Sequence, residues 1–247
     1  MLSFRLSLVI LMIAPTLLAQ DYNKYEVYGG YSRMREKSNI ESFSFTDPSG
    51  ATTPVTDLCS TQTGEILGPN SQQFFCKRRN FSGFDVSVTY NLSRYFGITG
   101  DITRHSKDQT FVDDFGGIIQ TIGTREHITS VLAGVRVKDN GPAARFKPFG
   151  HALIGTARYS DRQSQTIDAF PEFNYVANDR ESSLALKIGG GLDIRVTPRV
   201  DLRVIEVDYN PLYAKDRHYK NISGPFTFDV KGKTARNFTI GFGVVVH

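Results

Sequence analysis

The fold of this chain is decided by residues 84–92, which read Phe84-Asp85-Val86-Ser87-Val88-Thr89-Tyr90-Asn91-Leu92. Apolar side chains occupy every second position, and each side chain between them is polar. Because successive side chains of a β-strand point to opposite faces of the sheet, this pattern predicts a strand with one apolar and one polar face.

Weaker versions of the same alternation predict seven further strands, which makes eight in all. The clearest is residues 184–196, where apolar side chains alternate with glycine and charged side chains. Within residues 199–209 the apolar positions change phase, because Val204 lies on the same face as Glu206. A β-bulge near Ile205 would restore the alternation. The predicted strands are residues 24–34, 84–92, 96–103, 126–138, 146–159, 184–196, 199–209 and 234–246.

The connections between these segments alternate between long and short. The long ones are residues 35–80, 106–124, 160–182 and 210–233, and the short ones are residues 93–94, 139–145 and 197–198. Outer-membrane barrels have short periplasmic turns, longer extracellular loops and strands with an apolar outer face. We therefore predict an all-β fold, an eight-stranded antiparallel up-and-down transmembrane β-barrel with both termini on the periplasmic side.

Charged side chains on the polar faces must then point into the barrel. A lysine or arginine that faced the bilayer midplane would cost about 2–4 kcal/mol. The interior of an eight-stranded barrel is just wide enough for side chains to fill it, so opposite charges there should form pairs and block bulk flow. The predicted interior charges are Asp85, Asp101, Lys187, Asp193 and Arg195.

A soluble, lipocalin-like barrel is the alternative fold, since it would turn the same apolar faces inward. The chain contains no tryptophan, which removes a usual lipocalin signature, and its long loops all fall on one side. Both observations favour the membrane barrel.

The first nineteen residues have the composition of a secretory signal peptide. Arg5 precedes an apolar stretch, residues 6–18, and a small residue, Ala19, precedes the polar Gln20. We predict cleavage after Ala19 and a single barrel domain over residues 20–247. No later apolar run is long enough for a transmembrane helix, which needs about 20 residues.

Cys59 and Cys76 are the only cysteines, and both lie in the first long connection. An exported chain meets an oxidising compartment, which favours a disulfide between them on the extracellular side. Neither has a nearby histidine or further cysteine that would complete a zinc site. The net charge of +4 is dispersed among acidic residues, so no nucleic-acid partner is predicted.

A lipid-deacylating site on a barrel would need a histidine, a hydroxyl and a carboxylate together. The nearest arrangement is His127, Thr129 and Asp139, but threonine is a poor substitute for serine there and the aspartate falls in a turn. We therefore predict no catalytic residue, no cofactor and no metal site.

Other notable residues have structural interpretations. His105 and His218 are interpreted as loop or rim residues, and His151 as a strand residue. Residues 189–191 are successive glycines with no helix after them, which favours close packing or a bend in a strand over a phosphate site. Four tyrosines near predicted strand ends fit an interfacial aromatic girdle: Tyr90, Tyr95, Tyr159 and Tyr209.

These segments resemble the OmpA-like family of small outer-membrane β-barrel proteins. The similarity lies in the hairpin Tyr90-Asn91-Leu92-Ser93-Arg94-Tyr95-Phe96-Gly97 and in residues 147–155, 189–193, 202–209 and the last strand. It implies insertion by the barrel-assembly machinery, with Thr239, Gly241, Val244 and Val246 as the assembly signal. The chain ends on His247 where an aromatic residue is usual in the family, and no peptidoglycan-binding domain is expected.

The expected function is a structural or surface-interaction role in the cell outer membrane, carried out by the long extracellular loops. A narrow channel for ions or small solutes is one alternative, and an outer-membrane lipid-modifying enzyme is another. The expected partners are outer-membrane lipid, lipopolysaccharide and an extracellular ligand of unknown identity. The protein is expected to be a monomer.

Overall fold

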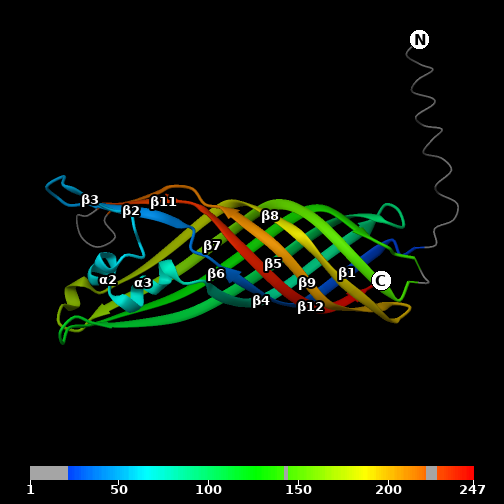
Figure 1. The fold of residues 1–247 in the computed structure, drawn as a ribbon, viewed down its shortest axis with the longest axis horizontal. Helices are drawn as coiled ribbons and strands as arrows, with labels where there is room; N and C mark the ends of the chain where they lie inside the picture. Colours follow the sequence, from blue (N-terminus) through cyan, green and yellow to red (C-terminus); the bar gives the residue numbers. More distant parts are fainter. Residues whose placement is uncertain (1–21, 142–143, 221–226) are drawn as a thin grey trace, which may run out of the picture.

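The computed structural model describes residues 22–141, 144–220 and 227–247, so the predicted signal peptide lies outside the described residues. Eight strands form a closed antiparallel barrel in the order β1-β12-β9-β8-β7-β6-β5-β4, as predicted (Figure 1). β1 pairs with both β12 and β4 and thereby closes the ring. The strands are β1 Tyr25–Glu36, β4 Arg79–Asn91, β5 Phe96–Asp114, β6 Ile119–Lys138, β7 Phe146–Ile167, β8 Tyr175–Thr197, β9 Val200–Tyr213 and β12 Thr234–Val246.

The alternation of side chains places the apolar face outside. In β4, Val86 is 40% exposed and Val88 is 52% exposed, whereas Asp85 and Ser87 are buried. A soluble barrel would show the reverse arrangement, because it would bury its apolar face. The lipocalin-like alternative is therefore wrong. Among the described residues, no helix is long and apolar enough to cross a membrane.

Two of the predicted long loops are mostly strand. β5 and β6 pair as far as Asp114 and Ile119, and β7 and β8 pair as far as Gln165 and Tyr175. β6 is 20 residues long, about twice what a tilted transmembrane strand needs. The side chains of the extensions are mostly polar, and pairing between neighbouring strands continues to satisfy the backbone groups there. The predicted strands end too early because the apolar alternation stops before the strand pairing does.

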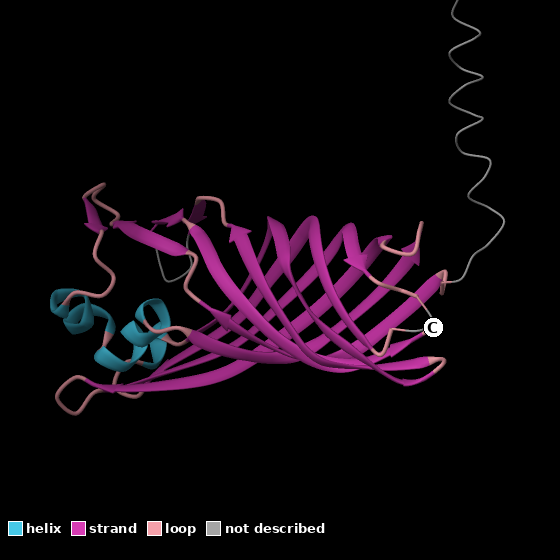
Figure 2. Ribbon diagram, turned by 45° about the vertical axis from the view of Figure 1, so that its right-hand side comes forward, coloured by secondary structure: helices cyan, strands magenta, loops and turns pink. Residues whose placement is uncertain are grey.

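The other two long connections fold together at the extracellular end. They form a four-stranded sheet in the order β10-β11-β2-β3, with β10 Arg217–Lys220, β11 Thr227–Gly232, β2 Ile40–Thr46 and β3 Thr52–Val55. Helices α2 (Thr61–Leu67) and α3 (Pro69–Cys76) follow β3, and a short 3-10 helix, Pro171–Phe173, lies between β7 and β8. Figure 2 shows the helices and this sheet beyond one end of the barrel, and Figure 1 shows the C-terminus at the opposite end.

The predicted β-bulge is present in β9. Glu206 pairs with Gly241 and Arg203 pairs with Gly243, so Val204 and Ile205 together oppose one residue of β12. Both bulged side chains are exposed on the outer face. The strands approach closely at this place: a Cβ on Gly191 would lie 2.0 Å from the Ile205 carbonyl oxygen. Close packing therefore explains the glycines at 189–191.

Candidate functional site

The centre of the barrel contains a lysine surrounded by carboxylates. Lys187 projects inward from β8, and its Nζ forms an ion pair with Asp85 of β4 and lies 3.1 Å from Asp101 of β5. On the opposite side it is 3.7 Å from Glu206 and 3.5 Å from Asp208, both of β9. All five side chains are buried. The network thus joins two opposite parts of the ring, β8–β9 and β4–β5, through one ammonium group.

A second cation lies on the periplasmic side of this lysine. The Arg203 guanidinium is 2.8 Å from Asp193 and 2.9 Å from Glu206, and it is fully buried. It stacks on the rings of Tyr28 and Phe149, each at 4.0 Å from the ring centroid. Ion-paired side chains and aromatic rings therefore fill this cross-section of the lumen together.

The periplasmic mouth is closed by further ion pairs. Lys138 Nζ is 2.8 Å from Glu26 and 3.1 Å from Asp193. Lys147 Nζ lies 2.7 Å from a carboxylate oxygen of Asp201, and Nε2 of the last residue, His247, lies 2.8 Å from the same oxygen.

Four of the five predicted interior charges, those at 85, 101, 187 and 193, are therefore buried in these networks. The fifth, Arg195, is only partly buried at the mouth, with its Nε 3.9 Å from Asp201.

Inside the lumen, an apolar layer lies between the charged centre and the extracellular mouth. Leu132, Leu153, Ala157 and Ala185 pack together inside the barrel, with Leu212 against them. Met34, Phe81 and Ile128 form a second cluster next to it, which Leu212 also contacts. This layer was not predicted from the sequence, because a polar interior was expected throughout the barrel. The signal was present where alternation fails, as at the adjacent apolar pairs 131–132 and 153–154.

The extracellular mouth contains a third charged cluster. Arg79 lies 2.6 Å from Glu36 and forms a further ion pair with Glu126, which also accepts a hydrogen bond from Tyr159. Tyr159 therefore faces the lumen, and its assignment to an aromatic girdle is wrong. Of the other three tyrosines of that prediction, Tyr90 and Tyr209 lie on the outer face, and Tyr95 is exposed in the turn between β4 and β5.

A disulfide-bonded cap lies above this cluster. The predicted bridge between Cys59 and Cys76 is confirmed, and it joins the segment before α2 to the end of α3. The backbone N–H of Asn70 donates to Asp113 at 2.8 Å, and the Asn70 side chain donates to the Val112 carbonyl at 2.7 Å. These bonds attach α3 to the outer end of β5.

The two histidines predicted as loop or rim residues lie in different surroundings. His105 is not a rim residue. It is buried in β5, and its Nε2 lies 2.6 Å from Ser32 Oγ. The strand extends past its predicted end, and its side chains continue to alternate between the lumen and the outer face. His218 lies exposed in β10 of the extracellular sheet. The arrangement of His127, Thr129 and Asp139 is not assembled, since Asp139 lies in the turn after β6, 2.7 Å from Arg94.

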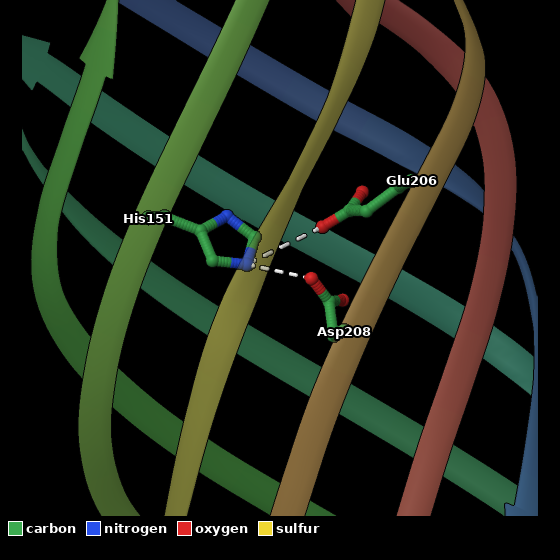
Figure 3. A group of neighbouring side chains, drawn as sticks. All are labelled: His151, Glu206 and Asp208. Carbon is green, nitrogen blue, oxygen red and sulfur yellow. Dashed lines mark hydrogen bonds and ion pairs between the residues drawn. The ribbon is translucent and has the colours of Figure 1, made fainter.

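His151, Glu206 and Asp208 have the composition of a metal site, and their ligand atoms lie within 4.8 Å of one another (Figure 3). His151 Nε2 is 2.9 Å from Asp208 and 3.8 Å from Glu206. The Lys187 ammonium, however, already lies beside both carboxylates. A cation would have to occupy the neighbourhood of this positive charge, so the three residues are best described as a branch of the central ion-pair network.

Comparison with known proteins agrees with this geometry. The family model described as the outer membrane protein beta-barrel domain matches residues 6–247. The chain belongs to this family. Members of the outer membrane protein beta-barrel family lie in the bacterial outer membrane, as predicted here for this protein.

Several solved structures are similar to the chain at low identity. Ail of Yersinia pestis is 13% identical with a TM-score of 0.40, over 90% of this chain and 99% of the other. OprG of Pseudomonas aeruginosa is 11% identical with a TM-score of 0.44, over 90% and 95%. The outer membrane protease OmpT of Escherichia coli is 10% identical with a TM-score of 0.48, over 93% and 99%. The search of curated proteins gave no match.

Proposed function

We propose that this outer-membrane barrel is a closed scaffold that presents its extracellular sheet and disulfide-bonded cap as a surface for interaction. The observation that carries the proposal is the filled lumen. Buried ion pairs centred on Lys187 and Arg79 lie on either side of the apolar layer around Leu132.

A filled lumen of this kind disfavours conduction for two reasons. An ion that crossed the layer around Leu132 and Leu153 would lose hydration against apolar side chains, because neutral polar groups such as Ser130 line only part of this level. The charges on either side are already paired with one another, so they are not free to attract a passing ion.

The extracellular end, in contrast, is built as a defined surface. β2 from the first long connection pairs with β11 from the last, which fixes two segments that are far apart in the sequence. The cap is fixed in turn by its disulfide and by the bonds from Asn70 to β5. A surface organised in this way loses less conformational entropy on binding than mobile loops would.

Planar-bilayer recordings on the purified protein test the closed lumen. We expect no stable unitary conductance. Large, lasting open steps would overturn the proposal and favour the channel. A variant with Lys187→Ala and Leu132→Ser, which removes the central cation and part of the apolar layer, serves as the positive control for leakage.

Display on cells tests the surface role. Cells that carry the full chain should bind to a panel of immobilised glycans and matrix proteins more strongly than cells whose protein has a short Gly-Asn-Gly-Ser linker in place of residues 37–78. Equal binding across the panel would contradict a role for the cap.

We also propose three steps of biogenesis and placement. The first nineteen residues direct export and are then removed. The assembly signal is formed by Thr239, Gly241, Val244 and Val246. The barrel lies as a monomer among outer-membrane lipid and lipopolysaccharide. The positions of Val244 and Val246 on the outer face support this assignment, because an external factor could reach them.

A further inference from the structure

The outer wall formed by β5 to β8 changes character where its apolar band ends. The last largely apolar row across these four strands consists of Ile102, Val131, Thr156 and Leu184. The strand register places the next outward row two residues further along each strand. That row consists of Arg104, Thr129, Arg158 and Ser182, which pair across the sheet in this order.

A third outward row continues the polar character. His127 pairs with Ser106 and Ser160, and Ser160 pairs with Arg180. We call Arg104, Arg158 and Arg180 the arginine patch. All three are exposed, and none forms an ion pair with any residue in the part of the chain that the structure describes.

No carboxylate on the outer face of the described strands forms an ion pair with the arginine patch. The nearby acidic residues Glu126, Asp161 and Glu181 occupy the alternate positions of their strands, which face the lumen side. On the outer face the next carboxylate is Asp108, one row further out, and it pairs with Arg125 at 3.4 Å.

The spacing suits one phosphorylated group. Adjacent strands lie about 4.8 Å apart, so Arg104 and Arg158, which are separated by one strand, have backbones about 10 Å apart. Long guanidinium side chains can converge across that distance. Thr129 lies between them, and its hydroxyl can donate to an oxygen held by both.

We propose that the arginine patch binds the phosphate groups of outer-leaflet lipid. Guanidinium groups recognise phosphate through paired, charge-assisted hydrogen bonds. The position decides in favour of a lipid over a soluble anion: the patch begins one row above Ile102 and Leu184, so a bound headgroup leaves its acyl chains against the apolar band. This inference rests on the proposed placement of the barrel among lipopolysaccharide and names the residues that contact it.

Native mass spectrometry on the detergent-purified barrel, with bis-phosphorylated lipid A as the probe, tests the inference. The variant Arg104→Gln/Arg158→Gln should bind the lipid about tenfold more weakly than the unmodified protein, because two charge-assisted contacts are lost. The matched control is Arg145→Gln/Arg199→Gln, which removes the same charge from exposed positions at the periplasmic end. It should bind almost as well as the unmodified protein.

The outcomes separate the alternatives. Equal weakening in both variants would mean that net charge alone drives binding, and unchanged binding in the first variant would mean that the lipid lies elsewhere; either result overturns the inference. Lipid A without phosphates should bind weakly to all three proteins. If inorganic phosphate competes fully at the same phosphate concentration, the patch is a site for soluble anions and the assignment to lipid is wrong.

Each protein is first checked for the heat-dependent gel shift of a folded barrel. Because lumen conductance does not depend on this outer face, failure here leaves the closed-lumen proposal standing.

Discussion

Lys187 forms ion pairs with four buried carboxylates, so its removal should be costly. In Lys187→Met, the carboxylates of Asp85, Asp101, Glu206 and Asp208 remain in a dry interior without this countercharge. Loss of one partner of a buried ion pair typically costs about 3–5 kcal/mol. We expect a loss of that size in the free energy of unfolding, measured by urea titration in lipid vesicles.

The matched control for Lys187→Met is Lys231→Met in the extracellular sheet. Lys231 lies 3.2 Å from Glu41, but both side chains are more than half exposed. Exposed pairs contribute at most about 1 kcal/mol. Equal effects of the two substitutions would show that the central network contributes no more than a surface pair does.

Asp139, in the periplasmic turn after β6, should make a small contribution to the free energy of unfolding that is lost in acid. Its pKa is lowered to about 2, first by the hydrogen bond from the Arg94 side chain and then by the Gly141 N–H. A pKa below the value in the unfolded chain adds stability above that unfolded value, about pH 4, which is lost as the pH falls toward 2. The pair is partly exposed, so this term should be below about 1 kcal/mol.

The measurement is the difference in unfolding free energy between the natural protein and Asp139→Asn. The difference should be present at pH 6 and shrink between pH 4 and pH 2. A difference that does not depend on pH would assign the effect to the turn conformation and not to the charge.

At the scale of single elements, the outward faces of the strands are the first test. Val86→Arg in β4 or Ile188→Arg in β8 places a charge on the lipid-facing surface and should cost about 2–4 kcal/mol near the bilayer centre. Ser106→Arg in β5 is the control, since it points outward above the apolar band beside His127. Folding yield into vesicles, read from the heat-dependent gel shift, should fall for the first two variants and hold for the third.

The helical cap should depend on its disulfide, whereas the barrel should not. The bridge spans 17 positions, and its loss in Cys59→Ser/Cys76→Ser should lower the local stability of the cap by about 3 kcal/mol. We expect faster tryptic cleavage after Lys77 or Arg78, which follow α3 directly. The heat-dependent gel shift should stay the same. Loss of that shift would mean that the barrel itself needs the bridge.

For the whole molecule, the barrel and the extracellular structures should be separable. Glu36 of β1 pairs directly with Arg79 of β4, so a short linker in place of residues 37–78 can close this hairpin. The variant should still fold as a barrel, because the contacts of the lumen lie below the deletion. It removes β2, however, and β11 then keeps only β10 of its two strand partners.

We therefore expect the segment around β10 and β11 to become sensitive to protease in this variant, while the extended β7–β8 hairpin stays resistant. Resistance of both segments would show that β10 and β11 are held in place without β2. Failure of the variant to fold would contradict the independence of the barrel.

The sequence determined the barrel. Alternation such as that of residues 84–92 has one solution in a membrane, because an apolar face must meet lipid and a closed ring must satisfy every backbone group. The same local logic predicted the bulge near Ile205 and the bridge between Cys59 and Cys76, since a change of phase and an isolated cysteine pair are visible in one segment.

Only the tertiary structure decided which side chains meet. Lys187 contacts carboxylates from β4, β5 and β9, and Tyr159 turns out to bond Glu126 inside the mouth. Pairings of this kind depend on how far each tilted strand is shifted against its neighbours. The pairing of β2 with β11 and the rows of the arginine patch depend on it too. Alternation specifies the face that a side chain occupies; its height in the barrel is set by the register of the closed ring, which is a property of all eight strands together.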